Sequence, residues 1–318
     1  MNTMARLLVL ILTLSLFGYA IPSAQSQSRF EDAGKLTTHR FKQEDYHRRY
    51  KLYTPANAKQ LRDPRPLVLV IHGGGSSDRG MIKLDKGRWR ELADQHGFYV
   101  VYPNAVNKLW DFGEGLTSEN LEDRVDDLAY FRRVINEVSK RKEIDQRRIF
   151  ATGISRGGQS SYFLAYNMPD RIRAIMPVAM SPPDFMENEC VSGPPVAIAV
   201  VNGTADPQVP YEGGWITVFR KKRDIVLSTD KTLALWRNRN GCADIPTKTS
   251  LIDKPDDKTS VDISQWSNCT GAPVKLFQVN NGGLTWPAGV QYLPPRIVGE
   301  TSNDINASDE GWAFFSQF

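Results

Sequence analysis

The hexapeptide Gly-Ile-Ser-Arg-Gly-Gly at 153–158 constrains the fold more than any other stretch of the chain. A short apolar run at 148–152 precedes it and predicts a buried strand, and residues 159–168 follow a helical pattern. A serine between glycines on a sharp strand-to-helix turn lifts its hydroxyl above the sheet, beside a helix start that favours an oxyanion. We therefore predict that Ser155 is a nucleophile. The simpler alternative is a Gly- and Ser-rich turn without chemistry.

Strand-like and helical segments alternate along the rest of the chain. Apolar runs predict strands at 67–71, 98–102, 172–180, 195–202 and 274–279, and periodic segments predict helices at 86–95, 123–142, 229–240 and 307–315. Two β-like runs at 36–41 and 49–53 predict an antiparallel edge, Pro103 is expected to break its strand, and residues 209–227 look like a loop. This alternation predicts a doubly wound, mainly parallel α/β sheet with right-handed crossovers, which together with the serine turn is the α/β-hydrolase fold.

The N-terminus has the pattern of an export signal. A short basic start at 1–6 is followed by apolar residues 7–21 and then by small and polar residues 22–26. This order predicts a cleaved signal peptide at 1–26, because the apolar run is short for a membrane span; an uncleaved anchor is the alternative. No linker or repeat divides residues 27–318, for which we expect a single domain.

Charge and cysteine usage narrow the choice of partners and compartment. The net charge of +4 over 318 residues is small and the basic residues are dispersed, so we expect neither nucleic acid nor a membrane as partner, and we expect a monomer. Export permits disulfides, and Cys242 and Cys269 are the preferred pair because they bracket a polar insertion at 241–271, leaving Cys190 as a lone thiol. No Cys or His cluster has metal-ligand spacing, so we expect no metal and no cofactor.

Several predicted strands are followed by residues that suit catalysis, at the sheet edge where ligands bind on this kind of fold. The Gly-rich stretch 72–75 follows one strand, and the backbone N–H of Gly74 is a candidate oxyanion donor together with that of Arg156. Asp206 follows a later strand, where the acid of a catalytic triad belongs; the alternative is a turn aspartate bonded to its own backbone. Trp110 and Trp286 lie on segments expected to border the pocket and are candidate substrate contacts, or else packing residues.

The general base that this arrangement needs is missing. On this fold the triad runs in the order serine, acid, histidine, with the histidine after the last core strand. The chain has four histidines, and all of them precede Ser155: His39, His47, His72 and His96. His72 falls near the predicted site, but a histidine at that strand end is more often bonded within its own loop.

The chain resembles the secreted esterase family that contains polyhydroxybutyrate depolymerases and feruloyl or acetylxylan esterases. The resemblance covers nearly the whole mature chain and rests on the serine turn and on the segments 71–74, 125–127, 202–207, 209–214 and 291–294. Similar proteins read Gly-Gly-His-Thr-Trp-Pro where this chain reads Gly-Gly-Leu-Thr-Trp-Pro at 282–287. The resemblance therefore implies a secreted serine esterase for polyester or for feruloyl or acetyl polysaccharide esters, in which Leu284 occupies the place of the catalytic histidine.

A leucine at this position removes the proton acceptor, so Ser155 stays a neutral hydroxyl and a weak nucleophile. Two hypotheses follow. The chain is either an esterase whose activity is impaired or a non-catalytic relative that binds the same ligand class. Ser155, Asp206 and both oxyanion segments are all retained, which counts against the second hypothesis and also fits a recent or deliberate single change of histidine to leucine; the sequence does not choose between these.

Overall fold

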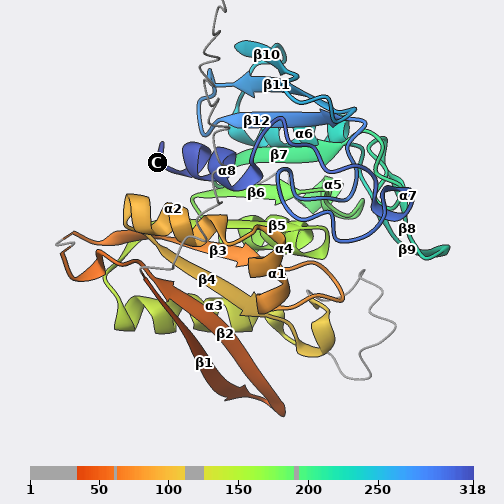
Figure 1. Cartoon of the computed structure of the whole chain (residues 1–318). Helices are drawn as coiled ribbons and strands as arrows, with labels where there is room; N and C mark the ends of the chain where they lie inside the picture. The colour runs from red at the N-terminus through yellow and green to blue at the C-terminus, as the bar shows by residue number, and fades with distance from the viewer. Residues whose placement is uncertain (1–33, 61–62, 112–124, 190–192) are drawn as a thin grey trace, which may run out of the picture. The chain divides into compact units, whose positions relative to one another are not determined.

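The computed structural model describes residues 34–60, 63–111, 125–189 and 193–318, so the predicted signal peptide and Cys190 lie outside the described residues. In this part of the chain ten strands form one sheet in the order β1-β2-β4-β3-β5-β6-β7-β12-β11-β10 (Figure 1). The strands are β1 (Lys35–Gln43), β2 (Tyr46–Thr54), β3 (Arg65–Ile71), β4 (Tyr99–Asn104), β5 (Ile144–Ile154), β6 (Ala174–Val178), β7 (Ala197–Gly203), β10 (Lys248–Ile252), β11 (Ser260–Trp266) and β12 (Val274–Asn280). The predicted α/β class is confirmed, with parallel strands in the middle and antiparallel strands at both edges.

Helices cover both faces of this sheet (Figure 1). On one face α2 (Arg88–His96) and α8 (Ala307–Phe315) pack together, and the rings of Trp89 and Phe315 lie 6.1 Å apart. On the other face lie α3 (Asp127–Arg141), α4 (Arg156–Asn167) and α6 (Thr229–Asn240). Shorter helices are α1 (Asp78–Leu84), α5 (Met186–Glu189) and α7 (Pro295–Val298), with 3-10 turns η1 (Ala58–Gln60) and η2 (Val106–Lys108). Among the described residues no helix is long and apolar enough to cross a membrane.

The central strands are buried along their whole length because helices cover them on both sides. Every residue of β6 and β7 is buried, and so are the last six residues of β3. Such continuous apolar strands are typical of parallel sheets. The sheet therefore forms a rigid platform, and β3, β5, β7 and β12 end at the edge where the candidate site lies.

Two expectations about local structure were wrong. Pro103 does not break its strand: it lies within β4, opposite Tyr50 of β2. Since β4 pairs with β3 only as far as Val101, the missing N–H of Pro103 breaks no bond on that side. Residues 209–227 hold a separate antiparallel hairpin of β8 (Gly214–Val218) and β9 (Lys221–Val226) rather than a simple loop.

The polar insertion at 241–271 extends the sheet. Its strands β10 and β11 form an antiparallel hairpin on β12. Cys242 and Cys269 form the expected disulfide at its base, with an S–S distance of 2.05 Å. The bond therefore fixes the two ends of the insertion beside each other.

Candidate active site

Ser155 lies at the end of β5 and immediately before α4, in a backbone conformation that a residue with a side chain rarely adopts. Its φ is 53° and its ψ is −123°. Such a conformation costs on the order of 1–3 kcal/mol, so the surroundings must enforce it. The backbone N–H of Ser155 donates to the carbonyl oxygen of Val178 at 2.9 Å, which ties the turn to β6. The turn therefore has the geometry predicted from the sequence.

The glycines on either side allow the turn to fit against β3. A Cβ on Gly153 would lie 2.5 Å from the carbonyl oxygen of Ile71, and one on Gly157 would lie 2.2 Å from the same atom. Both distances are far below van der Waals contact with backbone that cannot move aside. Any larger residue at either position would therefore displace Ser155.

The two candidate oxyanion donors lie next to the serine. A Cβ on Gly74 would lie 3.7 Å from the Cβ of Arg156, and one on Gly73 would lie 3.5 Å from that of Ser155, so the glycine-rich loop runs against the serine turn. Within the described part of the chain, the backbone N–H groups of Gly74 and Arg156 donate to no protein acceptor. The N–H of Arg156 is also the first of a helix, where it carries a partial positive charge. Both groups are free to bind an anionic oxygen.

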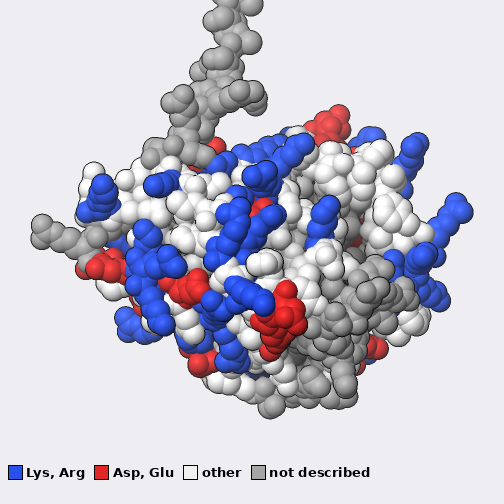
Figure 2. All heavy atoms as spheres, turned by 90° about the horizontal axis from the view of Figure 1, so that it is seen from below, with Lys and Arg blue, Asp and Glu red and all other residues white. Residues whose placement is uncertain are grey.

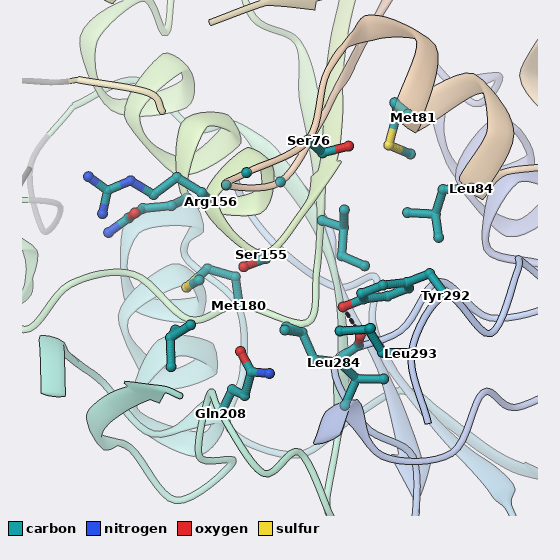
Figure 3. A pocket seen from close by; sticks show the side chains of 18 of the residues that line it. Ser76, Met81, Leu84, Ser155, Arg156, Met180, Gln208, Leu284, Tyr292 and Leu293 are labelled. Carbon is teal, nitrogen blue, oxygen red and sulfur yellow. Dashed lines mark hydrogen bonds between the residues drawn. The ribbon is translucent and has the colours of Figure 1, made fainter. Parts of the chain in front are cut away.

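A pocket of about 840 Å³ opens at this edge of the sheet. Most of its lining side chains are apolar, among them Met81, Leu84, Leu109, Met180, Ile216 and Leu293. Ser155 and Leu284 line the same pocket, and Tyr292 lies beside Leu284 (Figure 3). The pocket therefore offers the serine hydroxyl to an apolar group.

Leu284 is held firmly in the pocket wall. Its backbone N–H donates to Val298 at 2.6 Å, and its carbonyl oxygen accepts a hydrogen bond of 2.8 Å from the Tyr292 hydroxyl (Figure 3). The residue is 6% exposed. An aliphatic side chain here neither accepts nor donates a proton.

Asp206 lies in the loop that follows β7. In this loop the N–H of Ala205 donates to the carbonyl oxygen of Gly282 at 3.0 Å, and Gly282 belongs to the loop that carries Leu284. Its Oδ1 accepts hydrogen bonds from the backbone N–H groups of Gln208 and Val209, at 2.8 and 2.9 Å. Its Oδ2 is buried and has no partner among the described residues. Burial raises the pKa of Asp206 to about 7, although the two backbone N–H groups act in the opposite direction. A turn aspartate satisfied by its own backbone explains Oδ1 but leaves Oδ2 unexplained.

His72 is not placed to act as the base. Its Nε2 accepts the N–H of Ala105 at 3.1 Å, so the proton of the neutral ring is on Nδ1, which lies 2.8 Å from the carbonyl oxygen of Gly73. Complete burial lowers the pKa of His72 to about 4. The remaining histidines lie in β1, β2 and at the end of α2: His39, His47 and His96. None of these is among the residues that line the pocket.

The expectation that Trp110 and Trp286 border the pocket is corrected by the structure. Both side chains are buried, neither is among the lining residues, and each indole N–H donates inward, to His72 O at 2.8 Å and to Ser308 Oγ at 3.2 Å. Trp110 also packs on the ring of Phe131 at 5.1 Å. Both are packing residues that position the loops around the site.

A buried network fixes the loop that carries Trp110. Asp127, at the start of α3, forms an ion pair with Arg48 and accepts the backbone N–H of Asp111 at 2.6 Å. Asp126 caps the same helix by accepting the N–H of Ala129 at 2.8 Å. These carboxylates therefore organise the scaffold and do not reach the pocket.

No family model matches the chain. Over 269 residues it is 26% identical to NocK of Nocardia uniformis subsp. tsuyamanensis, provisionally named an esterase; the match covers 82% of this chain and 77% of NocK. It is 28% identical over 272 residues to a protein of Aspergillus flavus provisionally named feruloyl esterase C, covering 84% of this chain and 83% of that protein. The solved acetyl xylan esterase of Aspergillus awamori superposes with a TM-score of 0.56 over 88% of this chain and 99% of that chain, at 15% identity. The chain is homologous to esterases and has the α/β-hydrolase fold.

Other matches cover only a small part of the related protein. The match spans 22% of the bifunctional acetylxylan esterase/xylanase of Neocallimastix patriciarum and 31% of feruloyl esterase B of Piromyces equi.

In this homologue of esterases, one wall of the pocket was not predicted from the sequence. The hairpin β8–β9 contributes Ile216, Val218 and Phe219 to the pocket. Asp224 of the same hairpin forms a 2.8 Å ion pair with the side chain of Arg156, and both side chains are largely buried. The only sequence signal for this wall was the alternation of residues 214–218, since the turn that follows contains no glycine.

Proposed function

We propose that the chain is a serine hydrolase of carboxylic esters that lacks its general base. The observation that carries this proposal is the buried, unpartnered Oδ2 of Asp206, whose loop is bonded to the loop of Leu284, while Leu284 and Ser155 line one pocket. A histidine at 284 would give that oxygen a donor and Ser155 Oγ an acceptor, as in a triad. The elbow, the oxyanion donors and the acid are present, and only the residue between serine and acid is unsuited to proton transfer.

The chemistry open to such a site is acyl transfer. Ser155 Oγ attacks the ester carbonyl, and the N–H groups of Gly74 and Arg156 stabilise the oxyanion that forms. Without a histidine at 284 no imidazole takes the serine proton, and removing a triad member costs a factor on the order of 10⁴ to 10⁶ in kcat. Residual activity from the oxyanion donors and from binding is expected to be low.

The pocket and the relatives support two classes of ester. A mainly apolar pocket of about 840 Å³ accommodates a phenolic acyl group such as ferulate, or a segment of an aliphatic polyester such as polyhydroxybutyrate. Relatives named feruloyl and acetylxylan esterase favour an esterified plant polysaccharide, carrying feruloyl or acetyl groups, over the polyester.

The test is to restore the base. Leu284→His is expected to raise hydrolysis of p-nitrophenyl acetate by at least about 10³-fold, and Ser155→Ala in that background should return the rate to the wild-type level. Leu84→His is the matched control, because Leu84 lines the same pocket at the end of α1, apart from Leu284 and Ser155 (Figure 3). A wild-type rate that is already high and survives Ser155→Ala would show that the site is wrong. Equal gains from both histidine variants would also refute the proposal.

A second candidate function is ligand binding without turnover, which Leu284 itself favours because an aliphatic side chain cannot transfer a proton. The same variant separates the two. If Leu284→His folds but stays inert on esters while the protein binds esterified oligosaccharides tightly, measured by isothermal titration calorimetry, the binding role is correct.

The site of action that we propose is outside the cytoplasm. The signal-peptide pattern at 1–26 and the disulfide between Cys242 and Cys269 both support export to an oxidising compartment. Mass spectrometry of the mature N-terminus after expression in a secreting host tests cleavage near residue 26.

A further inference from the structure

The hairpin β8–β9 is anchored at its base and free at its tip. The N–H of Thr217 donates to Gln208 at 2.9 Å, the N–H of Leu227 donates to Pro182 at 3.0 Å, and Asp224 pairs with Arg156 at 2.8 Å. These bonds hold the strands against the body, while the turn extends beyond it (Figure 1). The base is therefore part of the pocket wall, and the tip stands at the pocket mouth.

The tip carries a run of cations. The turn reads Phe-Arg-Lys-Lys at 219–222, and Arg220, Lys221 and Lys222 are all exposed. None of the three forms an ion pair with a carboxylate among the described residues. In Figure 2 Lys and Arg side chains project from the molecule at the edge where Figure 1 places this hairpin. The carboxylate of the hairpin itself, Asp224, is buried and is bound to Arg156. The positive charge of the tip is therefore presented to solvent.

Exposed aromatic side chains accompany these cations. Phe219, Trp215 and Tyr292 are 75%, 45% and 41% exposed, and they are three of the five large exposed hydrophobic side chains among the described residues. Phe219 and Tyr292 also line the pocket. Lys222 Nζ lies 5.2 Å from the centre of the Trp215 ring. Phe219 and Tyr292 thus bring aromatic rings to the pocket entrance, beside cations that pair with no carboxylate among the described residues.

The turn conformation keeps this surface in place. Phe219 and Arg220 both have positive φ, 48° and 66°. Two such residues form the tight type of hairpin turn that usually takes asparagine or glycine. The chain keeps an aromatic and a cationic side chain here at a cost in backbone energy, which argues that the side chains serve a purpose at this position.

We propose that this hairpin tip binds the carboxylates of an acidic polysaccharide, so that the ester substrate is a polymer bearing uronic acid groups near its ester-linked substituents. The inference rests on the proposed function and names its substrate class more closely. Sugar rings present apolar C–H faces that pack on aromatic side chains, and uronate carboxylates bind cations at the pocket mouth. A neutral polyester would use the aromatic residues but not the cations.

The test uses the natural chain, which consumes substrate slowly at most because Leu284 replaces the base. The ligand is a xylan oligosaccharide carrying 4-O-methylglucuronic acid, compared with the same oligosaccharide after reduction of its carboxyl groups to alcohols. The variant Arg220→Ser/Lys221→Ser/Lys222→Ser removes the cations of the tip. The control Lys140→Ser/Arg141→Ser/Arg147→Ser removes three exposed charges at the opposite edge of the sheet, where α3 ends and β5 begins.

Isothermal titration calorimetry at low salt is expected to show about tenfold tighter binding of the acidic ligand than of the reduced one, because three exposed cations contribute modestly each. The tip variant should abolish this difference, and the control should retain it. Equal binding of both ligands by the natural chain overturns the inference, and so does an equal loss in the control. Equally tight binding of polyglutamate, a polyanion without sugar rings, also overturns it.

Two further measurements keep the result interpretable. If the triple variant does not fold, the single variants Arg220→Ser and Lys221→Ser should each show part of the loss, and no loss in either overturns the inference. Hydrolysis of p-nitrophenyl acetate by Leu284→His reports on the proposed function alone. Activity there without any preference for the acidic ligand would refute the polysaccharide inference and leave the esterase proposal intact.

Discussion

On the β3–β5 side of the pocket, a glycine-rich loop and the serine turn bring together Ser155 and two N–H groups that donate to no protein acceptor in the described chain. On the β7–β12 side, Asp206 keeps an oxygen without a partner and the neighbouring loop presents Leu284. The first side is made of backbone, fixed by close packing of Gly153 and Gly157 on β3. The second depends on one side chain. A single substitution can therefore remove proton transfer while leaving the oxyanion site intact.

The strongest way to sharpen this comparison is to remove the acid in two backgrounds. Asp206→Asn should cost the Leu284→His variant about 10⁴-fold in kcat, because an asparagine neither orients the histidine correctly nor stabilises its charged form. In the natural chain the same change should alter the rate by less than about twofold, since no histidine depends on it. Steady-state hydrolysis of p-nitrophenyl acetate measures both. Equal effects in the two backgrounds would mean that Asp206 and residue 284 do not act together.

The backbone side is tested by adding one methyl group. Gly157→Ala would place a Cβ 2.2 Å from Ile71 O and 2.7 Å from His72 O, so we expect a loss of more than about 4 kcal/mol in the free energy of unfolding or no folded protein at all. Gly74→Ala is the control, since its nearest contacts would be ordinary at 3.6 and 3.7 Å. Urea unfolding compares them. Similar stability of the two variants would contradict the claim that close packing enforces the turn.

The unpartnered Oδ2 of Asp206 predicts a pH effect on stability. Burial raises the pKa of Asp206 to about 7 in the folded chain, above its ordinary value near 3.8. The contribution of this group to stability is therefore full below about pH 4 and is lost as the pH rises through 7, by about 4 kcal/mol. Asp206→Asn removes that loss, so the variant should gain on the natural chain between pH 4 and pH 8 in urea unfolding. A constant difference between the two proteins would contradict the raised pKa.

The features that could be predicted from the sequence are those whose signals lie in neighbouring residues of the chain. The serine turn was predictable because its glycines are adjacent in the chain to the strand and helix they join. Helix α6 begins and ends as predicted because Ser228 caps its start and Gly241 ends it with a positive φ of 64°. Asp206 was assigned to its loop from the strand before it. Its unpartnered oxygen needed the three-dimensional arrangement.

The predictions that were wrong concern features without such a local signal. The hairpin β8–β9 was missed because its turn residues, Phe219 and Arg220, have the positive φ that asparagine or glycine usually adopts, and neither residue predicts a turn from the sequence. Trp110 and Trp286 were assigned to the pocket because their segments border it. Whether a tryptophan on such a segment faces ligand or core depends on tertiary partners such as Phe131 and Ser308, which sequence spacing does not reveal.

The smallest effect concerns His72, the histidine nearest the serine turn. His72→Phe should cost about 2 kcal/mol of stability, because the N–H of Ala105 would lose its buried acceptor. His96→Phe is the control, since His96 is exposed at the end of α2. If His72 is structural, the pH–rate profile of Leu284→His keeps its midpoint when His72 is replaced, because the titrating group is the new histidine. A midpoint that moves or disappears would show that His72 supplies the base. The β3–β5 side of the pocket would then provide the proton acceptor as well as the serine and the oxyanion donors.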